Sequence, residues 1–105
     1  MRLRAPFLRL VLRNSFMELE MNNVVVFAEA GKRGLYAEVY VDDVGYVYEK
    51  GRWTAYGGDG KPRAITAEDA KKLKSLAKRL STLPSYTVLE LLIKALNSVE
   101  AKARA

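Results

Sequence analysis

Aromatic rings are the side chains most able to do chemistry in this chain. Six of its ten aromatic residues fall between Tyr36 and Tyr56, in a stretch that otherwise reads as short β-strands. Tyrosine and tryptophan rings on a sheet have two uses: they fill a core under a helix, or they form a platform on which unpaired bases stack. The formal net charge of +6 makes base stacking worth pursuing, because phosphates need cations nearby. Both uses remain open at this point.

Most of the basic residues lie outside the aromatic stretch. Residues 17–60 carry four basic residues against eight acidic ones, so the aromatic sheet itself is mildly acidic. The basic residues at the expected strand ends and in the following loop are Lys32, Arg33, Lys50, Arg52, Lys61 and Arg63. In these positions they would hold phosphates while the rings take bases. A further Lys/Arg-rich segment over residues 66–83 is typical of a solvated helix face.

Catalysis and metal binding have little support in the sequence. The chain contains neither histidine nor cysteine, which removes the commonest general base, thiol nucleophiles and most zinc sites. The pair Asp42 and Asp43 lies in a turn, where aspartate is expected for conformational reasons. No pattern supplies a nucleophile, its base and an oxyanion site together. We therefore expect a protein that is not an enzyme and that uses no metal or cofactor.

The strand register decides which way the rings point. A three-residue loop over 43–45, with Gly45 left-handed, pairs Tyr40 with Tyr48 and places Glu38 opposite Lys50. A two-residue turn at Lys50 and Gly51 then pairs Tyr48 with Trp53. This register predicts one shared face for Tyr36, Tyr40, Tyr46, Tyr48 and Trp53. A slip of one residue at either turn would divide the rings between the two faces.

The remaining segments indicate a single α+β domain over residues 1–105. An N-terminal amphipathic helix is expected over Pro6–Phe16, within a basic arm spanning 1–20. A four-stranded antiparallel meander follows over 23–57. Thr66 and Asp69 predict a capping box at the start of a helical hairpin over 65–103, packed on the sheet.

The last expected helix is apolar on more than one stripe. Leu89, Leu92, Leu96 and Val99 recur at helical spacing, and Val88, Leu91 and Ala95 occupy a neighbouring face. One stripe would pack on the sheet, and the other predicts a homo-oligomer with this helix at its interface. The alternative is a helix buried completely within one core.

No stretch approaches the ~20 apolar residues of a transmembrane helix. We expect a cytoplasmic protein without membrane contacts. A different possibility is a peripheral membrane protein that places the Arg-rich N-terminal helix on anionic lipid.

The stretch Gly45-Tyr-Val-Tyr-Glu-Lys-Gly-Arg-Trp53, followed by a basic capped helix and a leucine-rich last helix, resembles the ThermoDBP family. These are single-stranded DNA-binding proteins of hyperthermophilic archaea. The resemblance implies a cleft of aromatic and apolar side chains flanked by basic residues, which binds single strands without sequence preference. It also implies oligomerisation, with Leu89–Val99 in the place of the family's C-terminal zipper. The leading hypothesis is sequence-independent binding of single-stranded DNA, or of RNA; the rival is a small oligomeric protein-interaction module with a purely structural aromatic core.

Overall fold

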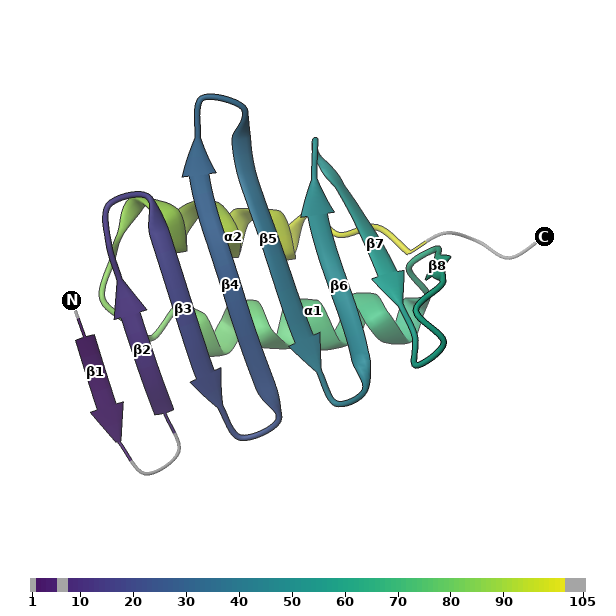
Figure 1. Cartoon of the computed structure of the whole chain (residues 1–105), viewed down its shortest axis with the longest axis horizontal. Coiled ribbons are helices and arrows are strands. Elements are labelled where there is room, and N and C mark those ends of the chain that lie inside the picture. Colours follow the sequence, from purple (N-terminus) through teal and green to yellow (C-terminus); the bar gives the residue numbers. More distant parts are fainter. Residues whose placement is uncertain (1, 6–7, 102–105) are drawn as a thin grey trace.

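A computed structural model describes residues 2–5 and 8–101 and shows one antiparallel sheet followed by two helices (Figure 1). The strands lie side by side in chain order, each paired with the next, and the last has only two residues. Their bounds are β1 Arg2–Ala5, β2 Leu8–Leu12, β3 Phe16–Met21, β4 Val24–Gly31, β5 Gly34–Val41, β6 Val44–Glu49, β7 Arg52–Tyr56 and β8 Pro62–Arg63. The helices are α1 Ala67–Leu80 and α2 Thr87–Asn97. The expected α+β class and C-terminal helical hairpin are confirmed.

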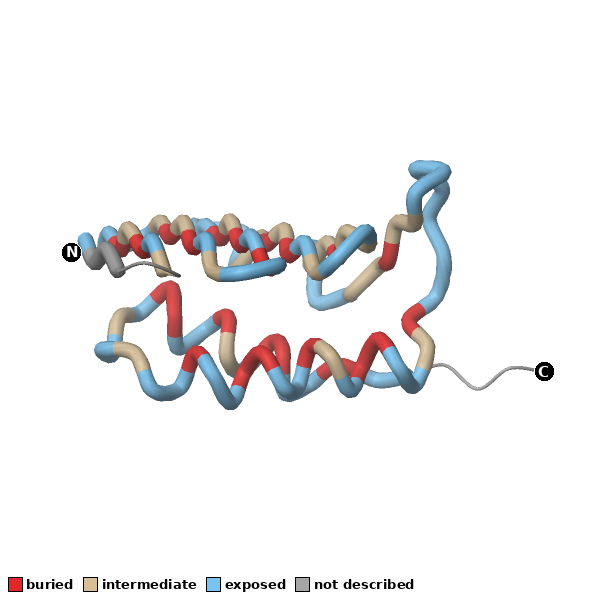
Figure 2. Tube along the Cα trace, turned by 90° about the horizontal axis from the view of Figure 1, so that it is seen from below, coloured by how far each residue is buried: buried red, intermediate tan, exposed pale blue. Residues whose placement is uncertain are grey.

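The molecule has two layers, with both helices on the same side of the sheet. Figure 2 shows the buried residues lining the space between the layers, while the outer side of the sheet carries no helix. Buried and more exposed residues alternate along β2, β3 and β4, as in Leu10 and Leu12 on β2 or Val24, Val26 and Ala28 on β4. The core therefore lies between one sheet face and the helical hairpin.

The expected N-terminal helix and four-stranded sheet are wrong. Residues 8–12 form β2 and residues 16–21 form β3, so most of the presumed basic arm belongs to the same sheet. Leu10 and Leu12 face the core while Arg9 is exposed, which is a period of two rather than 3.6. Pro6 and Phe7, where the helix was expected to begin, lie outside the described residues.

The turn between β5 and β6 differs from the expected loop. It contains two residues, Asp42 and Asp43, and Asp42 adopts the left-handed conformation with φ of 55°. Aspartate tolerates this region better than most residues because its short polar side chain bonds locally. Gly45 instead lies inside β6, where an added Cβ would come within 3.1 Å of the Tyr40 ring. Glycine at this position therefore makes room for the Tyr40 ring, and it does not form a turn of the chain.

This turn changes the pairing of the aromatic strands. Tyr40 faces Gly45 and Glu38 faces Val47, so the expected pairs of Tyr40 with Tyr48 and of Glu38 with Lys50 do not form. The expected pair of Tyr48 with Trp53 across the next turn is confirmed. Because the shift between the expected and observed β5–β6 registers is an odd number of residues, the five rings do not share a face.

Local signals account for the start of α1, and packing accounts for α2. Thr66 caps α1 through a reciprocal capping box with Asp69, as predicted. The residues proposed for oligomerisation all lie in the core. Leu89, Leu92 and Leu96 in α2 have exposed fractions of 1% or less, and Val99, just after the helix, is 3% exposed. They cannot serve as a surface interface in this fold. Leu91, on another side of the helix, is 39% exposed.

Candidate nucleic-acid interface

The rings proposed for stacking lie on two different faces of the sheet. Tyr36 and Tyr40 belong to the face without helices, whereas Tyr46, Tyr48 and Trp53 belong to the face that the helices cover. Tyr46 is completely buried, and Tyr48 and Trp53 are half-buried against the core. The structure therefore offers no continuous five-ring platform. Each group has to be considered in its own surroundings.

Tyr46 is part of a buried polar network with a structural role. Its hydroxyl donates a hydrogen bond to Asp69 Oδ1 at 2.6 Å, and Arg63 Nη1 donates to Asp69 Oδ2 at 2.5 Å. Burial alone would raise the pKa of Asp69, but the hydrogen bonds from Arg63, Tyr46 and Thr66 outweigh it and hold that pKa well below the usual range. Burial and the adjacent carboxylate also raise the pKa of the Tyr46 phenol. Arg63 is thus engaged by Asp69, although it was expected to grip phosphate.

Tyr48 and Trp53 form a pair where the sheet meets the end of α2. Their ring centroids are 5.0 Å apart with the planes tilted by 53°, and the Trp53 indole N–H donates to the Ala95 carbonyl at 2.9 Å. This bond fixes the orientation of the indole and satisfies a carbonyl in the last turn of α2. Because both rings are only half-buried, each keeps part of its surface accessible.

A groove of about 350 Å³ opens beside Tyr48, between the β4–β5 and β6–β7 turns and the C-terminal half of α2. We call it the tip groove. Its lining consists of Arg33, Gly34, Leu35, Tyr48, Lys50, Gly51, Leu91, Lys94, Ala95 and Ser98. Three of these side chains are cationic and none is acidic. In the part of the chain whose side chains are placed, only Arg9 and Arg63 form ion pairs, so these three cations are unneutralised.

A second, larger hollow of about 770 Å³ adjoins the tip groove and shares Gly51 and Ser98 with it. We call it the edge groove. It is lined in part by Arg52, Trp53, Arg63 and Glu100. The presence of Glu100 and the engagement of Arg63 with Asp69 make it less cationic than the tip groove. Together the two grooves bring Tyr48 and Trp53 next to basic side chains from three elements.

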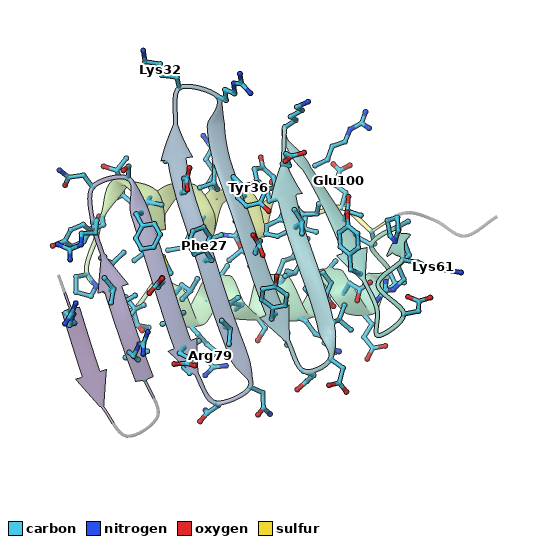
Figure 3. The ribbon with its side chains drawn as sticks, viewed as in Figure 1. Phe27, Lys32, Tyr36, Lys61, Arg79 and Glu100 are labelled. Atoms are coloured by element: carbon cyan, nitrogen blue, oxygen red, sulfur yellow. The ribbon has the colours of Figure 1, made fainter. Side chains whose placement is uncertain are left out.

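The other predicted cations are dispersed. Lys32 is at the β4–β5 turn but does not line either groove, and Lys61 lies in the loop before β8, at a different edge of the molecule (Figure 3). Sequence reasoning missed Lys94 and named Leu91 only as part of a second apolar stripe of the last helix; α2 brings both to the tip groove. A lysine in the last turn of a helix is ordinary, since it complements the helix dipole, so the sequence carried no signal for this role.

The two rings on the uncovered face have acidic surroundings. The hydroxyls of Tyr36 and Tyr40 both donate to the Glu38 carboxylate, at 2.9 and 2.5 Å. Burial, this hydrogen bond and the charges of Glu38 and Glu49 raise the pKa of Tyr36 to about 12. Such a negative environment opposes the approach of a phosphate backbone. These two tyrosines are therefore poor nucleic-acid contacts.

The described residues contain no group of three or more His, Cys, Asp or Glu side chains placed to hold a metal ion. Neither α1 nor α2 combines the length and apolar composition of a membrane span, and the described part of the chain has no other helix. Comparison with protein-family models, with curated proteins and with solved structures found no match.

Proposed function

We propose that this protein binds single-stranded nucleic acid in the tip groove, with the adjacent edge groove extending the site. The observation that carries the proposal is the set of three unneutralised cations, Arg33, Lys50 and Lys94, around the half-buried ring of Tyr48. Lysine and arginine at such spacing bind phosphates, while an accessible tyrosine edge or face accepts a base. The site is a revision of the stacking face expected from the sequence.

The composition of the groove supports sequence-tolerant binding. A cation contacts the phosphate that every nucleotide carries, and a ring stacks on any base. No asparagine, glutamine or carboxylate lines the tip groove to read the edge of a particular base. DNA and RNA single strands both fit this description, and an oligo-dT strand is the simplest probe because it forms little structure of its own.

The decisive experiment compares two double variants with the same charge change. Arg33→Gln with Lys94→Gln removes two groove cations, whereas Lys61→Gln with Lys71→Gln removes two exposed cations that lie outside it. We expect the groove variant to bind labelled oligo-dT roughly tenfold more weakly, from about 0.7 kcal/mol for each exposed contact. The slope of log affinity against log salt should become shallower by about 1.4, since each phosphate contact on a single strand contributes about 0.7.

Fluorescence anisotropy of the oligonucleotide measures both quantities, and quenching of Trp53, the only tryptophan, reports binding near the grooves. Equal losses in the two variants would mean that binding follows overall charge and would exclude the tip groove as the site. Absence of oligo-dT binding by the wild type at low salt would reject the function itself.

A further inference from the structure

The side of the sheet that no helix covers has a composition of its own. We call it the open face and define it by the outward-facing residues of β2 to β7. Figure 3 views the sheet from this side, with Phe27 and Tyr36 labelled on it. Its aromatic residues are Phe16, Phe27, Tyr36, Tyr40 and Tyr56, and its acidic residues are Glu18, Glu20, Glu29, Glu38 and Glu49. Half of the chain's aromatic residues thus lie outside the core, on one surface.

Rings and carboxylates alternate across the open face. Phe16 pairs with Glu29, which in turn pairs with Tyr36 on the next strand. In the neighbouring row Phe27 stands between Glu18 and Glu38. In these two rows, carboxylates and rings therefore stand next to one another on neighbouring strands. This differs from an ordinary solvated sheet face, where carboxylates are usually mixed with cations and form cross-strand ion pairs with them.

The negative charge on the open face is only partly compensated. The outward residues of β2 to β7 include five glutamates against two arginines, Arg9 and Arg52, a difference of three. Arg9 lies 3.9 Å from Glu18 and 4.0 Å from Glu20, and Arg52 forms no ion pair with any side chain that the structure describes. Glu29, Glu38 and Glu49 have no cationic partner among the placed side chains. In a chain of net charge +6, this face carries the opposite sign.

The composition excludes several occupants. A second open face would bring glutamates against glutamates, and a nucleic acid would bring phosphates against them. The α1 helix of a second copy offers Lys71, Lys74 and Lys78, but these exposed positions supply no apolar side chain for the rings. The phenylalanines, the tyrosines and the 44%-exposed Val25 need apolar contacts, while the glutamates need cations. One partner has to supply both.

We propose that the open face binds a Lys/Arg-rich amphipathic polypeptide segment from another protein. Its apolar side chains would contact the rings, and its cations would lie between the glutamates, where cation–π contacts add to the charge attraction. Six strands at about 4.8 Å span roughly 24 Å, which equals the length of a helix of about 16 residues. A helix of that size on this side would complete a third layer over the sheet. Arg52 belongs both to the open face and to the edge groove, whereas the tip groove, which carries the nucleic-acid proposal, lies at the strand ends.

The test uses a labelled 18-residue peptide of leucine and lysine in helical amphipathic order, with matched leucine/glutamate and alanine/lysine peptides. We expect the wild type to bind the leucine/lysine peptide, to bind the alanine/lysine peptide several-fold more weakly and to ignore the leucine/glutamate peptide. Glu29→Gln with Glu49→Gln should weaken leucine/lysine binding about tenfold. The control, Asp43→Asn with Glu68→Gln, removes two exposed carboxylates that lie away from the open face. It should change the affinity for the leucine/lysine peptide less than twofold.

Equal weakening in both double variants, equal binding of the two lysine peptides, or no binding would overturn the proposal. A wild type that self-associates by light scattering, and becomes monomeric in the Glu29/Glu49 variant, would assign the open face to a second copy instead. Affinity for oligo-dT should be no lower in the Glu29/Glu49 variant, so this result is separable from the proposed nucleic-acid function.

Discussion

The hydroxyl of Tyr46 lies 2.6 Å from Asp69 Oδ1 and joins the middle of the sheet to the first turn of α1. Both side chains are buried, with Tyr46 at 0% and Asp69 at 4% exposure. The same carboxylate accepts hydrogen bonds from Arg63 and from the backbone and hydroxyl of Thr66. A buried charge is tolerated here because several donors surround it. One residue thus fixes α1, β6 and the short β8 relative to one another.

Tyr46→Phe should therefore destabilise the protein by about 1.5–3 kcal/mol, the usual contribution of a hydrogen bond to a charged group. Chemical denaturation measures the change in the free energy of unfolding. Tyr48→Phe is the matched control, because it removes the same atom on the same strand, where the hydroxyl has no hydrogen bond to any described residue. A loss of similar size in both variants would contradict a special role for the Tyr46–Asp69 bond.

Asp69 should make stability depend on acidic pH. Its pKa is held below that of an unfolded aspartate, so its stabilisation is fully present above about pH 4 and is lost as the pH falls through the folded value. Asp69→Asn should accordingly be much less stable than wild type at pH 7, and the difference should shrink as the pH is lowered below 4. Melting temperatures from pH 7 to pH 2 test this, with Glu68→Gln, an exposed neighbour, as the control. A pH-independent difference for Asp69→Asn would argue against the charge as the cause.

The turn between β5 and β6 offers a stabilising substitution. Asp42 has a positive φ, whereas Asp43 does not. A positive φ costs an L-residue conformational energy that glycine avoids. Asp42→Gly should raise stability by about 0.5–1 kcal/mol, and Asp43→Gly should lower it through greater freedom in the unfolded chain. Differential scanning calorimetry of the two single variants measures both signs. Destabilisation by Asp42→Gly would show that the aspartate side chain contributes more than its backbone conformation costs.

This turn also shows what the sequence could and could not predict of the fold. The capping box at Thr66 and the Lys50–Gly51 turn are local signals, and both predictions are correct. The two-residue turn at Asp42 was missed because Gly45 is the stronger candidate for a left-handed position, and its real role, making room for the Tyr40 ring, depends on the partner strand. Register depends on such cross-strand contacts, which are not local.

The N-terminal strands do carry a strand signal in the sequence. Met17, Leu19 and Met21 alternate with Glu18 and Glu20, a period of two that predicts a half-buried strand, and all five residues lie in β3 as that pattern requires. Over residues 8–12 the apolar residues are too closely spaced to show a clear period of two, and the spacing of the arginines also fits one face of a helix. Short apolar segments fit both periods, and sheet pairing decided between them.

The candidate site was predictable only in part. The sequence predicted the cations Arg33, Lys50 and Arg52 from their places at strand ends, and Tyr48 and Trp53 from their cross-strand pairing. All five line one of the two adjoining grooves. Lys94 joins them from more than forty residues away, through packing of α2 against the sheet. Tyr36 and Tyr40 were placed with the other rings only because of the incorrect register. Non-local packing is what separates the core, the grooves and the open face.

Replacement of the Tyr48 ring should weaken nucleic-acid binding without unfolding the protein. Tyr48→Leu keeps an apolar side chain against the core but removes the stacking surface, so oligo-dT binding should fall by roughly 1–3 kcal/mol. Anisotropy titration measures the affinity, and a thermal melt verifies the fold. Tyr40→Leu, a change of the same kind on the open face, should leave affinity unaltered within twofold. A larger loss of oligo-dT affinity in Tyr40→Leu than in Tyr48→Leu would instead place the bound oligonucleotide on the open face.

The final prediction distinguishes a core helix from an interface helix. Leu92 is completely buried in α2, whereas its neighbour Leu91 is 39% exposed. Leu92→Glu loses the packing of the leucine and forces a carboxylate into the core, so it should cost more than about 4 kcal/mol and abolish the cooperative melt. Leu91→Glu should change stability by less than about 1 kcal/mol, because the new charge stays in water. Circular dichroism melts with light scattering separate the outcomes. A folded Leu92→Glu variant that merely dissociates from an oligomer would show that α2 is an interface between subunits rather than the centre of one core.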